Sequence, residues 1–264
     1  MRDMKLDVAN FLGLLVSLMM YGLYLVMFFA TIEDQWRRRK RIPVAVYVTI
    51  CLFATTTGNV ALFIADFYNA WANCGDVDVI EYFANTRTPI LPLRYLFITI
   101  SGAIADVLMC WRLYIIWSRN LRILIFPVLL LCIEVVLSVL LCALSFVGYR
   151  STGKYHKTYL VMSIIAGACT LIMNMTCTAL IVGKLWSARH KSLAIERRSL
   201  YKAVSITLIE SGTLYTGTLL AWIIAILIPG GYGVHCFIEY ILAMVMGIAP
   251  MLILLQLKIN NNMR

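Results

Sequence analysis

The amino-acid sequence predicts an all-α, multi-pass membrane protein: a bundle of seven transmembrane helices with the N-terminus outside and the C-terminus in the cytosol. Hydrophobic residues make up 62% of the chain and charged residues only 14%, and the mean hydropathy of +0.86 lies far outside the soluble globular range. The apolar residues gather in seven runs, each about 20 residues long, the length that crosses a bilayer as a helix. Lys and Arg gather at alternate connections between the runs, which is typical of a fixed membrane orientation.

Short connections separate the runs and leave no hydrophilic stretch long enough for a second domain, so residues 1–264 are expected to form one membrane domain. The first run lacks an Ala-x-Ala cleavage sequence, which predicts a retained helix and not a removed signal peptide. In chain order, the runs lie near residues 8–30, 43–66, 93–117, 122–147, 158–184, 203–228 and 236–257.

Polar residues inside the second and third runs are the first functional candidates, because ionisable groups are costly in hydrocarbon. Asn59 and Asp66 are seven positions apart and share one helical face. In the third run Asp106 and Arg112 are six positions apart, a rotation of about 240° that points the two side chains to different faces.

The fourth and fifth runs each carry a polar face. In the fourth run it consists of Glu134, Ser138, Cys142 and Ser145; in the fifth it consists of Ser163, Gly167, Thr170, Asn174 and Thr178. Such a face either packs closely against another helix or lines a hydrated ligand cavity, and both interpretations stay open. Glu134 and Asp106 are expected at one depth, roughly 18 Å from the cytosolic edge, where two carboxylates are expected to have a raised pKa or to share a proton.

The sixth run brings Glu210 to the depth of Arg112, each roughly 8–10 Å from the cytosolic end. An interhelical Arg112–Glu210 pair would neutralise both charges, and in the alternative the Arg112 side chain extends to the membrane interface. The seventh run contains Gly247-Ile-Ala-Pro250, which predicts a kink.

The basic residues predict the orientation. Fifteen Lys and Arg follow the first, third and fifth runs or lie in the C-terminal tail, against seven on the other side, and the more basic side is the cytosolic one. The net charge of +10 is therefore a topology signal that adds attraction to anionic lipid, and no nucleic-acid binding is expected. The chain is expected in the plasma membrane or an endomembrane.

Two cysteines lie at the predicted outer side of the membrane. Cys74 follows the second run and Cys236 begins the seventh, so both lie on the predicted outer side, where a disulfide between them is a candidate. The other cysteines lie within the runs, where a thiol acts as a small apolar filler.

Catalytic and metal-binding motifs are absent from the sequence. His156, His190 and His235 all lie at connections or run ends, so no metal site inside the bilayer and no cofactor are expected. No Gly-x-Ser-x-Gly, His-Glu-x-x-His or phosphate-binding loop occurs either. We therefore expect no enzyme; the remaining enzymatic alternative is an embedded lipid or terpene enzyme that uses an intramembrane carboxylate.

Several sequence pieces spread along the chain carry a resemblance. They are Tyr21-Gly22-Leu-Tyr24, Asp106-x5-Arg112-x-Tyr114-x2-Trp117, Asn174-x3-Thr178-Ala-Leu-Ile-Val-Gly-Lys-Leu-Trp186, Ile209-Glu210-Ser211-Gly212-x2-Tyr215 and Gly247-Ile-Ala-Pro250. In these pieces the chain resembles a largely uncharacterised family of seven-span integral membrane proteins from basidiomycete fungi, loosely similar to G protein-coupled receptors. The resemblance implies a seven-helix bundle and carries over no catalytic residue.

The leading hypothesis is a receptor-like sensor. It would bind a small-molecule ligand from the outer side, in a cavity between the second, third, fifth and sixth runs that reaches Asn59 and Asp106, and would meet a cytosolic signalling partner at its basic loops. The main alternative is a proton-coupled or small-solute transporter that uses Asp106 and Glu134.

Overall fold

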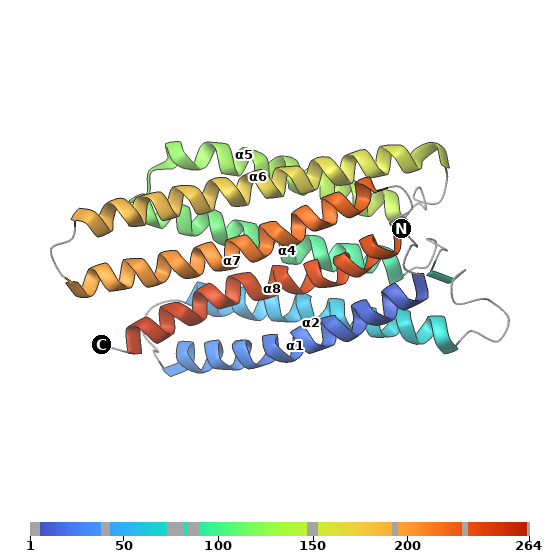
Figure 1. Cartoon of the computed structure of the whole chain (residues 1–264), viewed down its shortest axis with the longest axis horizontal. Coiled ribbons are helices and arrows are strands. Elements are labelled where there is room, and N and C mark those ends of the chain that lie inside the picture. Colours follow the sequence, from blue (N-terminus) through green and yellow to red (C-terminus); the bar gives the residue numbers. More distant parts are fainter. Residues whose placement is uncertain are drawn as a thin grey trace.

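The computed structural model describes residues 6–37, 43–72, 82–83, 90–146, 153–191, 195–228 and 232–262. Within these residues the chain forms seven long helices, each with a segment long and apolar enough to cross a bilayer. The prediction of an all-helical, multi-pass integral membrane protein is confirmed. The helices in Figure 1 are α1 (Leu6–Arg37), α2 (Pro43–Ala72), α4 (Ile90–Ile116), α5 (Leu121–Phe146), α6 (Gly153–Lys191), α7 (Ile195–Leu227) and α8 (Tyr232–Asn262).

The helices alternate in direction, so the start of α1 and the end of α8 lie at opposite ends of the bundle (Figure 1). We call these the N-terminal end and the C-terminal end. At the C-terminal end α6 and α7 reach beyond the other helices, and both continue past their apolar segments, which span Lys157–Ala188 and Val204–Leu227. These extensions stay helical because Lys, Arg, Glu and Ala have high helix propensity in water as well.

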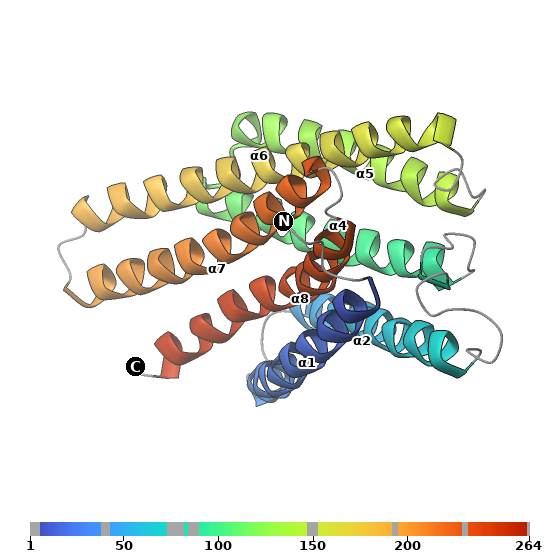
Figure 2. The same cartoon turned by 45° about the vertical axis from the view of Figure 1, so that its right-hand side comes forward.

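α8 is the central helix. It packs against α1, α2, α4 and α7, and Figure 2 shows it between α7 on one side and α1 with α2 on the other. Residues that are buried make up 72% of its apolar segment, against 6% in α5. In the described part of the chain, α5 contacts α4 and α6 alone, so its remaining faces, rich in exposed Leu, Ile and Val, are available to lipid.

Two glycines let α8 approach its neighbours closely. A Cβ on Gly13 of α1 would come within 2.7 Å of the Tyr240 ring on α8, and a Cβ on Gly247 within 2.8 Å of the Thr56 hydroxyl oxygen on α2. Both distances are too short for a side chain, so the missing Cβ atoms set the spacing of these helices. This is the use of small residues that membrane interfaces favour.

The turn between α4 and α5 is the tightest described connection. Ser118 and Arg119 adopt positive φ angles of 53° and 64°, a conformation that costs about 1 kcal/mol or more for residues with a side chain. Backbone bonds from Ser118 to Ile115 and from Arg119 to Tyr114 hold it, and the Asn120 side chain accepts a bond from the Arg122 backbone at the start of α5. These bonds offset the strain and fix α5 beside α4.

The close approach at Gly13 generates a test. Gly13→Ala should lower the free energy of unfolding by about 1–3 kcal/mol, because the new methyl group forces the buried Tyr240 ring to move. Gly22→Ala, in the same helix, is the matched control, since a Cβ there meets nothing within 4 Å. Thermal unfolding of the two variants in detergent measures the difference, and equal melting temperatures would contradict the packing described.

Candidate functional site

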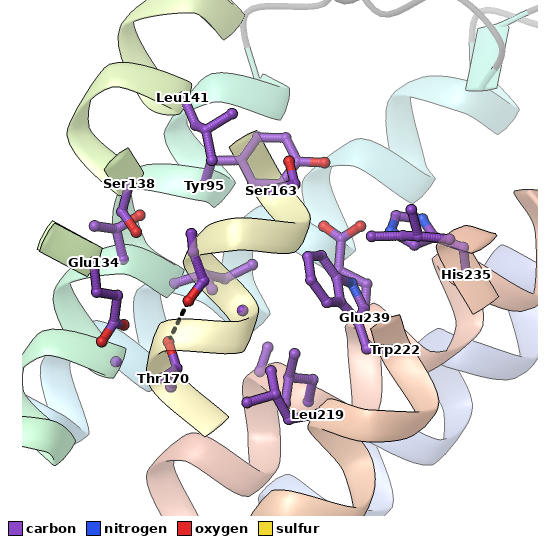
Figure 3. A pocket seen from close by; sticks show the side chains of 18 of the residues that line it. Tyr95, Glu134, Ser138, Leu141, Ser163, Thr170, Leu219, Trp222, His235 and Glu239 are labelled. Carbon is purple, nitrogen blue, oxygen red and sulfur yellow. Dashed lines mark hydrogen bonds between the residues drawn. The ribbon is translucent and has the colours of Figure 1, made fainter. Parts of the chain in front are cut away.

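A cavity of about 380 Å³ lies in the N-terminal half of the bundle (Figure 3). It is lined by α4, α5, α6, α7 and α8, and none of the described lining residues comes from α2. The cavity expected from the sequence therefore lies elsewhere than predicted: the fourth and seventh runs take part in place of the second. Its polar lining consists of Tyr95, Thr99, Glu134, Ser138, Cys142, Tyr159, Ser163, Thr170, Trp222, His235 and Glu239.

The floor of the cavity lies near the middle of the bundle. Glu134 of α5, Thr170 of α6 and Met246 of α8 line it there. The Glu134 carboxyl group is buried, with 9% of the residue exposed, and it lies beside both Thr170 and the Asp106 carboxyl group. The sequence expectation that Asp106 and Glu134 meet at one depth thus agrees with their positions in the structure.

A second, smaller pocket begins below this floor. It measures about 30 Å³, room for about two water molecules. Asp106, Arg112 and Asn174 line it together with Tyr215, and Met246 lines both the pocket and the cavity above. Asn174 Nδ2 donates a hydrogen bond to Asp106 Oδ1 at 3.1 Å, while Asp106 Oδ2 and the Tyr215 hydroxyl are buried without a hydrogen-bond partner.

Arg112 takes neither of the arrangements that the sequence suggested. Its Nη2 donates to the Pro250 carbonyl oxygen of α8 over a long 3.4 Å, and its Nη1 is buried without a hydrogen-bond partner. The expected Arg112–Glu210 pair does not form, because Glu210 is exposed on the outside of α7. Extension to the membrane interface does not occur either, since the guanidinium group points inward.

Helical angle explains the correction. Glu210 has the right depth, but one residue turns a helix by about 100°, and the face of α7 that lines the small pocket belongs to Ser211, Gly212 and Tyr215. Depth along a helix can be read from the sequence; which face meets a neighbour depends on the packing of the whole bundle.

The two polar faces of α5 and α6 have a mixed role. Glu134, Ser138 and Cys142 of α5 line the cavity, as do Ser163, Gly167 and Thr170 of α6. Farther along α6, Thr178 packs against Gly212 of α7, where a Cβ would lie 3.2 Å from the Thr178 hydroxyl oxygen. Each face thus lines the cavity in the half of the bundle near the N-terminal end. Nearer the C-terminal end, the face of α6 packs against α7.

A buried ionic cluster lies beside the cavity at the N-terminal end. The Arg94 guanidinium of α4 contacts the Asp66 carboxylate of α2 at 2.9 Å and the Glu239 carboxylate of α8 at 4.0 Å. It also lies over the Phe63 and Tyr240 rings, 4.2 and 5.0 Å from their centroids. We call these five residues the Arg94 cluster. Glu239 also lines the cavity, so the cluster and the cavity share a carboxylate.

Two outer residues support this cluster. The Tyr82 hydroxyl donates to Asp66 Oδ1 at 3.3 Å, and burial with the nearby Asp66 charge raises the pKa of Tyr82 to about 12. Tyr82 therefore keeps its donating proton at physiological pH. The Tyr240 hydroxyl donates to Asn10 Oδ1 at 3.1 Å and so connects α1 to the same cluster.

The sequence predicts part of this arrangement. Asp66 was a candidate, but Arg94 was counted with the outer basic residues and Glu239 was missed. The signal was present: both lie a turn or two inside an apolar segment, where an ionisable group is costly. Asn59 is buried, with 2% exposed, but lines neither the cavity nor the small pocket.

The remaining candidates give no further site. Cys236 lies in the first turns of α8, whereas Cys74 lies outside the described residues, so their disulfide stays a prediction. Among the residues that the structure describes, no group of His, Cys, Asp or Glu side chains is placed to hold a metal ion.

Comparison with family models, with curated proteins and with solved structures finds no match for this chain. The resemblance to seven-span fungal proteins remains a prediction. The function must therefore be argued from the cavity and its charges.

The Arg94 cluster generates a stability test. Arg94→Met should cost about 3–5 kcal/mol of unfolding free energy, because it leaves two carboxylates without their cation. The double variant Arg94→Met/Asp66→Asn should recover part of the loss, since it removes one stranded charge. Thermal unfolding in detergent measures both. Arg122→Met, at an exposed position of α5, is the control; a loss as large there would mean that burial of Arg94 is not the cause.

Proposed function

We propose that this protein is a receptor-like sensor: a small molecule binds in the cavity, and its presence changes the packing of α8 toward the C-terminal end. The observation that carries the proposal is the shared floor. Met246 lines both the cavity and the small pocket, and the Glu134 and Asp106 carboxyl groups meet between them. A molecule that fills the cavity would contact Met246, which also lines the small pocket together with Arg112.

The contact between Arg112 and the Pro250 carbonyl is weak, as expected of a contact that a ligand can change. Arg112 reaches Pro250 over 3.4 Å and leaves Nη1 without a partner. Pro250 also deprives its helix of one backbone hydrogen bond, which makes bending there less costly. A small displacement of Met246 can therefore be passed to the C-terminal part of α8. A ligand that favours one of two such arrangements shifts their populations.

Orientation and partners follow the charge pattern. With the N-terminal end outside, the cavity accepts ligand from the outer side, and the basic connection between α6 and α7 lies in the cytosol. The projecting ends of these helices (Figure 1) offer a surface for a cytosolic signalling partner. The protein would reside in the lipid bilayer of the plasma membrane or of an endomembrane.

A filled cavity should act like a bound ligand. Gly102 lines the cavity, and a Cβ there would lie 3.7 Å from Met246 Sδ, so Gly102→Leu fills space and presses on the floor. Amide hydrogen exchange in the part of α8 after Met246 should become several-fold faster. Gly217→Leu on α7 is the control, because its Cβ meets nothing within 4 Å. Unchanged exchange in Gly102→Leu would contradict the sensor mechanism.

The corrected role of Arg112 makes a separate prediction. Arg112→Met should change the same exchange pattern, because it removes the only side-chain bond described to the Pro250 carbonyl. Glu210→Gln should leave the pattern as in the unmodified protein, since Glu210 is exposed. An effect of Glu210→Gln equal to that of Arg112→Met would restore the pairing that depth alone suggested.

A proton-coupled transporter is the second candidate, favoured by the two carboxyl groups that connect the cavity to the small pocket. Proteoliposomes with an internal pH-sensitive dye discriminate between the two. Proton flux that Asp106→Asn abolishes would favour transport; a sensor should show none.

A further inference from the structure

We infer that the ligand of this cavity is an organic cation: a protonated amine on an aromatic or alkyl body, with its ammonium group against Glu239. The inference rests on the proposed function, since it names the chemical class that the sensor would detect. It is carried by the charges that face the cavity.

The cavity wall is acidic without a matching base. Glu134 and Glu239 contribute carboxyl groups, and no Lys or Arg is among the described residues that line the cavity. The one imidazole, that of His235, lies one turn before Glu239 on the same face of α8. A negative ligand would thus meet two acidic groups and no strong cation.

Arg94 balances the charge of Glu239 only in part, because it is shared with Asp66. One guanidinium group faces two carboxylates, and Asp66 holds it at 2.9 Å while Glu239 is 4.0 Å away. Arg94 is also confined between the Phe63 and Tyr240 rings, so it cannot turn into the cavity without leaving both. Among the described residues, the Arg94 cluster therefore has one cation for two carboxylates, and the more distant carboxylate, Glu239, is the one that lines the cavity.

The floor has the same deficit. Glu134 is 9% exposed and its Oε2 has no hydrogen-bond partner, while its ionisable neighbour is another carboxyl group, Asp106. A buried carboxyl oxygen without a hydrogen bond is costly, and a cation in the cavity would relieve that cost at Glu134. Figure 3 shows Glu134 apart from Glu239, so the cavity presents acid at two separate places.

The walls between these acids fit the rest of such a molecule. The centroids of the Trp222 and His235 rings are 5.5 Å apart, and His235 lies one helical turn before Glu239 on α8. An ammonium group at Glu239 is therefore within reach of the face of the Trp222 ring, which is a favourable cation–π arrangement. Trp222 Nε1 is buried without an acceptor and can bind a hydroxyl or carbonyl oxygen. Apolar residues such as Leu219 and Leu242 complete the wall, and the volume of about 380 Å³ is within the range of small-molecule sites.

The amine could belong to a free molecule or to a lipid, and matched pairs of probes separate the two sources. Tryptamine and dodecylamine represent the two bodies; tryptophol and dodecanol replace the amine of each by a hydroxyl, and indole-3-acetate carries a negative charge. Binding is measured as the shift in unfolding temperature and as Kd, with the purified full chain in nanodiscs.

We expect at least one amine to bind at least tenfold more tightly than its alcohol, and indole-3-acetate not to bind. Glu239→Gln should weaken that amine at least tenfold, whereas Glu239→Asp, which keeps the charge, should weaken it less and shows that the fold tolerates a change there. Glu210→Gln makes the same chemical change on an exposed face and should alter Kd less than twofold. If tryptamine binds more tightly than dodecylamine, the ligand is a free amine; if dodecylamine binds more tightly, it is a lipid amine.

The inference is overturned if no amine binds more tightly than its alcohol, including the case in which none binds, or if Glu239→Gln leaves the affinity unchanged. Its failure is distinguishable from failure of the sensor. Amine binding that leaves α8 exchange unaltered would remove the sensor but keep the ligand class; an exchange response to Gly102→Leu without amine binding would do the reverse.

Discussion

The bundle depends on how it neutralises charge where water is absent. Arg94 cannot release its proton, and its position among α2, α4 and α8 is tolerated because Asp66, Glu239 and two aromatic rings surround it. The same contacts fix the angular positions of three helices at once, and the Tyr240–Asn10 bond brings in α1. Since removal of a charged partner leaves a buried charge without its counter-charge, these contacts hold the helices together.

The sequence was sufficient for properties that depend on distance along the chain. The seven spans, their approximate ends and the common depth of Asp106 and Glu134 follow from apolar run length and helical rise. It was insufficient for properties that depend on angle. Glu210 matched Arg112 in depth but is exposed on α7, whereas Ser211 and Tyr215 on the inner face are buried. No single-chain pattern states which face of one helix meets which neighbour.

The position of the cavity was missed for a related reason. The prediction placed it between the second, third, fifth and sixth runs; the last three do line it, whereas Asn59 and Asp66 of the second run are buried elsewhere. Their helix, α2, packs against α1, α4 and α8, and Asp66 is used by Arg94. Space remains where α5, held by α4 and α6 alone among the described helices, stands farther from the centre. Empty volume arises from imperfect packing of several helices, which polar residues on one of them do not reveal.

The centrality of α8 has a consequence for how the protein is made. α8 follows the other six described helices in the sequence, yet it contributes Glu239 to the Arg94 cluster, Met246 to the cavity floor and Pro250 to Arg112. During synthesis, the six helices that precede it enter the membrane with their future core unfilled, and Arg94 has Asp66 as its carboxylate partner until the seventh arrives. The core of these seven helices is therefore completed only when α8 packs against α1, α2, α4 and α7. A stop codon placed before α8 would spare the other six described helices and still remove the centre of the bundle.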